Sequence, residues 1–157
     1  MERVIYIVFD KILSFFIKVI GTILSLTIIL QIFSRIIMIH PFTWTEELSR
    51  FSFIWFCFLG SAYALHKKLH MGIDYFYRQY GPKKQRKIEI FVQLIILLFG
   101  ALLVYYGIVL VQLTSIQLST ILRIPMSYMF SVLPITGTFF CLASVNQILS
   151  SRKQRRD

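Results

Sequence analysis

The sequence predicts an all-α membrane protein with four transmembrane helices, and three observations support this fold class. The 157 residues are 57% hydrophobic and only 15% charged, and the mean hydropathy is +0.71. The hydrophobic residues form four long stretches, and the charged residues gather in the gaps between them. A stretch of about 20 apolar residues is what a helix needs to cross roughly 30 Å of hydrocarbon. We therefore expect a single transmembrane domain over residues 1–157.

Prolines and charged residues set the boundaries of the expected spans. The first span ends before Pro41, because proline disfavours helix in the residue that precedes it. Pro82 breaks the polar stretch between the second and third spans. Pro125 suits the first turn of the fourth span, and Pro134 is expected to kink that helix by removing a backbone hydrogen bond. The expected spans are approximately residues 12–39, 47–65, 88–113 and 125–149.

The distribution of lysine and arginine predicts the orientation. Seven lie between the second and third spans, four in the C-terminal tail and three near the N-terminus, whereas only three lie on the opposite side. Positive residues favour the cytoplasmic side, so both termini and the middle loop are expected to be cytoplasmic. This arrangement requires an even number of crossings, which agrees with four. The aromatic segment 74–80 is flanked by cations and is expected to form a short interfacial amphipathic piece.

A polar cluster opens the second span at its outer end, with the sequence Trp44-Thr45-Glu46-Glu47-Leu48-Ser49-Arg50. Thr45 is a candidate N-cap, because threonine side chains accept hydrogen bonds from free backbone N–H groups at helix starts. The two glutamates then lie in the first turn, where the helix dipole favours negative charge. The segment therefore predicts a well-defined helix start at the membrane surface.

The same cluster predicts ion pairs. Arg50 is four residues after Glu46 and three after Glu47, so it can pair with either on one helix face. Arg35, about one turn inside the outer end of the first span, is the other cation expected to meet these glutamates. Ionisable groups at this depth usually face protein or water. One interpretation is an ion-pair lock between the first two spans or a contact to another protein; the alternative is a capped helix whose long side chains reach the interface.

The histidines near the end of the second span admit two interpretations. His66 and His70 are four residues apart, a spacing that can present two imidazoles to one metal. No carboxylate or cysteine offers a third ligand, so we expect no metal. A contact between His70 and Asp74, one turn later, is the favoured reading.

Small residues mark places where helices can approach closely in lipid. Gly60 and Ala64 form one such pair in the second span, and Gly100 and Gly107 form another in the third. The alternative is ordinary tolerance of glycine in membrane helices. The two cysteines, Cys57 and Cys141, are expected to be small buried hydrophobic residues.

Several classes of function are disfavoured by what the spans lack. No carboxylate lies at mid-depth, where a proton- or sodium-coupled carrier needs one, and no mid-span histidine is available as a haem ligand. No nucleophile–base set or glycine-rich phosphate loop is present. The net charge of +10 lies at the ends of the spans, which indicates lipid headgroups rather than nucleic acid. We expect no enzyme activity and no cofactor.

The chain resembles the small membrane subunit of tripartite ATP-independent periplasmic (TRAP) transporters, the DctQ-like family. Nearly the whole chain shares the resemblance. The Trp–Glu-Glu–Arg element together with the His-x-x-x-Asp element makes it specific, and each alone is weak. The segments that carry it are Gln31–Arg35, Trp44–Arg50, Leu59–Ala62, His70–Asp74, Arg123–Tyr128 and Leu133–Ile135.

The resemblance implies a multi-pass protein of the bacterial inner membrane that does not itself carry the solute. It implies a large membrane subunit with the substrate and sodium sites and an elevator-type motion, and a periplasmic binding protein that delivers an organic acid such as a dicarboxylate or a sialic acid. No catalytic or ligand residue carries over. The candidate structural or partner-interface residues are Arg35, Trp44, Glu46, Glu47, Arg50, Gly60, Ala64, His70, Asp74, Pro125 and Pro134.

Two other functions remain as alternatives. A small self-assembling four-helix carrier or exporter needs a membrane-embedded glutamate in its first span, and residues 12–39 contain none. A membrane anchor of a respiratory enzyme predicts a haem spectrum, which the histidine positions do not favour.

Overall fold

The computed structural model describes residues 7–38, 41–67 and 82–153, and the surroundings of side chains within residues 9–38, 41–67 and 87–148. Four of its helices are long and apolar enough to cross a membrane, which confirms the all-α fold class. Helices suit a membrane because they satisfy their own backbone hydrogen bonds. The elements are the π-helix η1 (Ile7–Leu13) and the α-helices α2 (Ser14–Ile37), α3 (Trp44–His66), α5 (Pro82–Leu113), α6 (Met126–Phe130) and α7 (Val132–Lys153).

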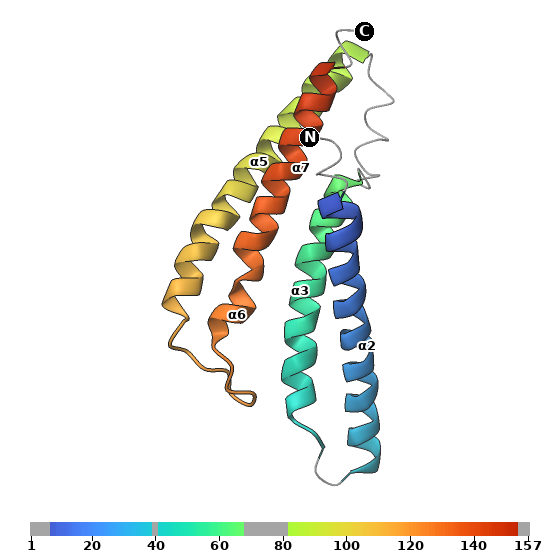
Figure 1. Cartoon of the computed structure of the whole chain (residues 1–157), viewed down its shortest axis with the longest axis vertical. Helices are drawn as coiled ribbons and strands as arrows, with labels where there is room; N and C mark the ends of the chain where they lie inside the picture. Colours follow the sequence, from blue (N-terminus) through green and yellow to red (C-terminus); the bar gives the residue numbers. More distant parts are fainter. Residues whose placement is uncertain (1–6, 39–40, 68–81, 154–157) are drawn as a thin grey trace.

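The helices form two antiparallel hairpins that lie side by side (Figure 1). Helix α2 packs along α3, α5 packs along α7, and α3 and α7 join the two hairpins. The α2–α3 link and the loop before α6 lie at one end of the molecule, which we call the loop end. The start of η1, the end of α3, the start of α5 and the end of α7 lie at the opposite end, which we call the terminal end.

Several helix boundaries differ from the expected spans. Helical structure in the first span begins at Ile7 rather than near position 12, and α5 begins at Pro82, six residues before the expected start. The fourth span is interrupted at Ser131, between α6 and α7. Pro134 lies in the first turn of α7 and has no N–H to donate to the Phe130 carbonyl, so the break at Ser131 falls where the missing bond of this proline is expected to disturb the span. Ile135 N–H donates to the Ser131 carbonyl at 3.3 Å as regular bonding resumes.

Glycine allows α5 and α7 to pack closely. A Cβ atom added at Gly107 would lie 2.7 Å from Cδ of Pro134, and one added at Gly137 would lie 2.7 Å from the carbonyl oxygen of Gly100. Both distances are too short for real carbon contacts, so these positions require glycine in this packing. The sequence predicted that a helix packs closely against Gly100 and Gly107, and in the structure that helix is α7 of the same chain.

A small apolar core lies where η1, α3 and α7 meet. The Phe9 ring stacks on the His66 ring at 4.3 Å and meets the Phe139 ring edge-on at 5.4 Å. The outward faces of α2 and α5 remain apolar and uncovered, as expected for surfaces that face lipid or another membrane protein. The buried core residues are Phe9, Leu13, Leu59, Ala62, Leu65, Val132 and Ala143.

Candidate functional site

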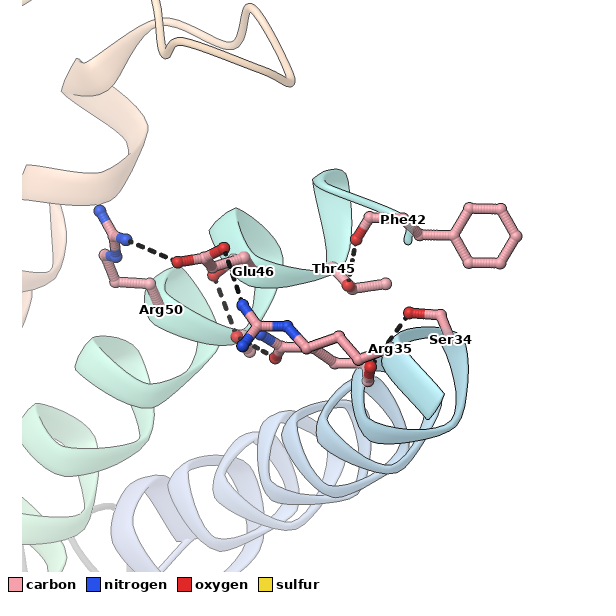
Figure 2. A network of polar contacts seen from close by, with 8 residues as sticks. Ser34, Arg35, Phe42, Thr45, Glu46 and Arg50 are labelled. Atoms are coloured by element: carbon pink, nitrogen blue, oxygen red, sulfur yellow. Dashed lines mark hydrogen bonds and ion pairs between the residues drawn. The ribbon is translucent and has the colours of Figure 1, made fainter. Parts of the chain in front are cut away.

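The polar cluster at the loop end is centred on Glu46. Its carboxylate lies 3.4 Å from Nη2 of Arg35 on α2 and 3.7 Å from Nη2 of Arg50, one turn later on α3. Figure 2 shows the glutamate between the two guanidinium groups. The three side chains are 50–66% exposed, so in water such pairs would contribute little. The cluster joins the first two spans, and Arg50 pairs with Glu46 rather than with Glu47.

Two hydroxyl groups complete this cluster. Ser49 Oγ donates to the side-chain carbonyl of Gln31 at 3.4 Å, which gives α2 and α3 a second contact. Thr45 Oγ1 donates to the Phe42 carbonyl at 2.6 Å (Figure 2). The expectation that Thr45 is the N-cap was wrong, because the cap position lies two residues earlier, at Thr43, which makes no side-chain hydrogen bond, and the helix begins at Trp44.

Glu47 makes a different contact from its exposed neighbour. Its side chain is 7% exposed, and Oε2 accepts hydrogen bonds from the backbone N–H groups of Ile121 at 3.0 Å and Leu122 at 2.8 Å. Both donors belong to the loop before α6, in the second hairpin. A buried carboxylate is tolerated when it receives such bonds. Glu47 therefore ties α3 of the first hairpin to the loop of the second.

The loop that Glu47 holds is a tight turn. Ser119 N–H donates to the Ile124 carbonyl at 2.9 Å, and Met126 N–H donates to the Gln117 carbonyl at 2.8 Å. Between them, Arg123 adopts a φ of 51°, a left-handed conformation that is uncommon for residues other than glycine. Ser119 is 3% exposed, and its hydroxyl accepts from Ile124 N–H at 3.3 Å. The turn is thus fixed by its own bonds and by Glu47.

A second polar cluster lies at the terminal end and was missed from the sequence. The Asp10 carboxylate pairs with Lys67, lies 3.8 Å from Nε2 of His66 and accepts a hydrogen bond from the Tyr63 hydroxyl at 3.5 Å. These contacts hold η1 against the end of α3. An acidic residue just before a long apolar stretch was the available signal, since ionisable groups at such positions need partners.

Two glutamines join three helices at the terminal end. Gln93 Nε2 on α5 donates to Oε1 of Gln147 on α7 at 2.5 Å, and Gln147 Nε2 donates to the Leu65 carbonyl on α3 at 2.8 Å. Both glutamines are 7% exposed. Like Glu47 at the loop end, this contact crosses between the hairpins. Nothing in the linear sequence indicated that these two residues would meet.

The other candidate residues occupy varied positions. Gly60 lies on a part of α3 that no other helix of the described chain covers, since a Cβ atom there would meet nothing within 4 Å. Cys57 is exposed, so the expectation of burial was wrong for it, whereas Cys141 is partly buried. Trp44 is 38% exposed at the start of α3. Pro125 caps α6.

The contact expected between His70 and Asp74, and the amphipathic segment 74–80, fall outside the described residues. Among the residues that the structure describes, no three histidine, cysteine or acidic side chains are grouped to hold a metal ion.

The comparisons with known proteins agree with this architecture. A sequence model of the family described as "Tripartite ATP-independent periplasmic transporters, DctQ component" matches residues 24–154. The chain is 25% identical over 123 residues to the sialic acid TRAP transporter small permease protein SiaQ of Vibrio cholerae, and the match covers 78% of this chain and 71% of that protein.

A second relative is longer. The chain is 32% identical over 109 residues to the sialic acid TRAP transporter permease protein SiaT of Haemophilus influenzae. That match covers 69% of this chain and 18% of the relative, so this chain spans less than a fifth of that protein's length.

The family match extends from within α2 to the end of α7 and includes both glutamates at the loop end. The chain belongs to the DctQ component family of the tripartite ATP-independent periplasmic transporters.

Proposed function

We propose that this chain is the non-catalytic small permease subunit of a sodium-coupled transporter that depends on a periplasmic binding protein. In this proposal the chain braces the static scaffold of a large membrane subunit in the bacterial inner membrane, with both termini on the cytoplasmic side. The solute is an organic acid of the sialic acid or dicarboxylate type. Both relatives are named as sialic acid TRAP transporter proteins, which supports this class of solute.

The observation that carries the proposal is the absence of charge from the central parts of the spans. A coupled carrier needs ionisable groups at mid-depth to bind protons, ions or charged solutes. This chain has no Asp, Glu, Lys, Arg or His in the stretches 19–34, 51–65, 90–113 and 126–148.

The described polar contacts also favour a supporting role. Glu47 holds the loop of the second hairpin, and the Gln93–Gln147 pair holds α5, α7 and α3 together. These groups are occupied in binding one part of the chain to another. Two hairpins that are hydrogen-bonded to each other at both ends form a rigid unit, because satisfied buried polar groups resist displacement. A rigid unit is suited to bracing a partner subunit.

A stripe on the exposed face of α3 is the proposed surface for the large subunit. Its residues recur at alternating spacings of four and three, the pattern with which one helix packs along another. The stripe carries charged residues near the start of α3, at Glu46 and Arg50, and small residues towards its end, at Gly60 and Ala64. Small residues allow the close approach of a second helix. No helix of the described chain covers Gly60. The stripe consists of Glu46, Arg50, Phe53, Cys57, Gly60 and Ala64.

Cys57 provides the test of this surface, because it lies in the middle of the stripe and is exposed. A Cys141→Ser variant would be labelled with a membrane-permeant maleimide, alone and in complex with the large subunit. We expect Cys57 to react readily in the isolated chain and about tenfold more slowly in the complex. A matched control lacks both native cysteines and carries Phe91→Cys, whose position on α5 is 63% exposed; it should react equally in both states.

Gly60→Leu should in addition reduce recovery of the large subunit with the tagged chain, because the added side chain would fill the space that a partner helix occupies. Equal labelling of Cys57 in both states, together with full recovery of the partner by Gly60→Leu, would show that the stripe is not the interface.

A further inference from the structure

A groove of about 320 Å³ lies between α3 and the segment that opens the fourth span. Phe51 and Trp55 form its wall on α3, and Pro125 and Met129 contribute to the opposite wall. Its lining is almost entirely apolar. In size it falls at the lower end of the range of ligand pockets in proteins.

Glu47 fixes the shape of this groove. Glu47, Phe51 and Trp55 follow one another at intervals of four, so they share one face of α3. The Glu47 carboxylate accepts hydrogen bonds from the N–H groups of Ile121 and Leu122, and Leu122 lies two residues before Ile124, the first residue of the opposite wall. The two walls are therefore held together at the loop end by a buried hydrogen-bonded group.

Two arginines are sequence neighbours of residues that line the groove. Arg123 directly precedes the wall residue Ile124; it is exposed and forms no ion pair with the described residues. Arg50 directly precedes Phe51, and its side chain pairs with Glu46 at 3.7 Å on the neighbouring face of α3, so Arg123 is the cation available for an anion. Guanidinium groups match the geometry of phosphate oxygens and bind them through two parallel hydrogen bonds.

A second groove on the molecule lacks this combination. It has a volume of about 260 Å³ and lies between α5 and α7, where Leu102, Tyr106 and Leu133 line it. The spans that form it contain no lysine or arginine between residues 90 and 113 or between residues 126 and 148. An arginine next in sequence to a lining residue is thus a feature of the first groove and not of the second.

We propose that the groove between α3 and α6 binds one acyl chain of a phospholipid whose phosphate is held by Arg123. A phospholipid supplies an apolar chain and an anionic phosphate in a single molecule, which matches both halves of the site. A helix of another membrane protein would match the apolar walls and leave the unpaired guanidinium group of Arg123 without an anion.

Native mass spectrometry of the full chain tests this proposal. The delipidated protein would be titrated in detergent with phosphatidylglycerol. We expect one lipid to be retained per chain, and Arg123→Ala to weaken its binding by about tenfold. Met129→Trp, which fills the groove, should weaken it similarly. Arg35→Ala removes a cation from the same end, and Leu102→Trp fills the other groove; both controls should bind the lipid as the unaltered chain does.

A measurement on the unaltered chain does not depend on how the variants fold. Phosphatidylglycerol with a photoreactive diazirine in its acyl chain should cross-link to residues 51–55 or to Met129. Cross-links spread evenly over α2 and α5, or equal binding by all four variants, would overturn the proposal.

Two further results would assign the groove to another ligand and overturn the proposal as well. Displacement of the lipid by inorganic phosphate alone would indicate a simple anion site. Loss of the large subunit from Met129→Trp with unchanged lipid binding would indicate a protein occupant. Lipid binding is measured on this chain alone, so its failure is distinct from failure of the proposed transport role.

Discussion

The Glu47 carboxylate on α3 accepts a hydrogen bond from the backbone N–H of Leu122, 75 residues later in the chain, at 2.8 Å. This contact joins the two helical hairpins at the loop end. At the terminal end, Gln147 donates to the Leu65 carbonyl at 2.8 Å and joins the same two hairpins. The hairpins are therefore connected at both ends of the molecule by buried polar groups.

Removal of the Glu47 carboxylate should destabilise the chain far more than removal of its neighbour. In Glu47→Ala the N–H groups of Ile121 and Leu122 lose their acceptor inside the protein, at a cost of about 2–4 kcal/mol in the free energy of unfolding. Glu46→Ala removes exposed ion pairs and should cost about 0–1 kcal/mol. Denaturant unfolding in detergent, followed by circular dichroism, measures both.

Glu47→Gln keeps an acceptor oxygen and should fall between the wild type and Glu47→Ala. If Glu46→Ala and Glu47→Ala destabilise the chain equally, the buried contact with the loop is not what holds the hairpins together.

The glutamine contact predicts a non-additive pair of substitutions. Gln147→Leu leaves the Gln93 amide and the Leu65 carbonyl without this partner, which should cost about 1–3 kcal/mol. The double variant Gln93→Leu with Gln147→Leu replaces both amides by apolar groups, so it should be less destabilised than the sum of the single variants. A double-mutant cycle from unfolding free energies tests this; strict additivity would show that the two side chains act independently.

Gly107 is tightly packed and Gly60 is not, so replacing each by alanine should have opposite effects on the stability of the chain. Gly107→Ala places a Cβ atom 2.7 Å from Pro134 and should destabilise the chain by about 1–3 kcal/mol through overpacking. Gly60→Ala meets nothing within 4 Å and should be neutral or stabilising by about 0.5–1 kcal/mol in the isolated chain. Thermal unfolding of the two variants in the same detergent compares them, and equal destabilisation would contradict the packing described between α5 and α7.

The Asp10 cluster predicts local loosening at the start of the first span. Asp10→Asn removes the negative charge that faces Lys67 and His66, so it should weaken the contacts that hold η1 against the end of α3. Amide hydrogen exchange should accelerate within Ile7–Leu13 and remain unchanged at the loop end. Lys18→Gln, which alters an exposed charge in α2, serves as the control. Unchanged exchange in Asp10→Asn would show that η1 is held by its apolar contacts alone.

Much of the fold was predictable because the membrane imposes strong constraints on sequence. Long apolar stretches gave the number and type of the helices, since only a helix of this length satisfies its backbone across hydrocarbon. Pro134 indicated an irregularity in the fourth span, and the break at Ser131 lies between Phe130 and Pro134, where proline cannot donate the bond to the carbonyl four residues earlier. Pro125 was less informative, because it stands one residue before α6 rather than in its first turn.

The candidate site was predictable only where its contacts are local. The spacing of Arg50 from Glu46 indicated their pairing, because both lie on one helix face. The partners of Glu47 are backbone groups 74 and 75 residues away, and no periodicity encodes such a contact. The same holds for Gln93 and Gln147, which meet only because α5 and α7 pack together.

Reconstituted transport tests the central claim, that this chain supports another subunit and moves no solute itself. The chain and the large subunit would be placed in liposomes separately and together, with an inward sodium gradient, a periplasmic binding protein and radiolabelled sialic acid or a C4-dicarboxylate. We predict uptake only when both membrane subunits are present. Sodium-driven uptake by liposomes that contain this chain as their single membrane protein would contradict the account.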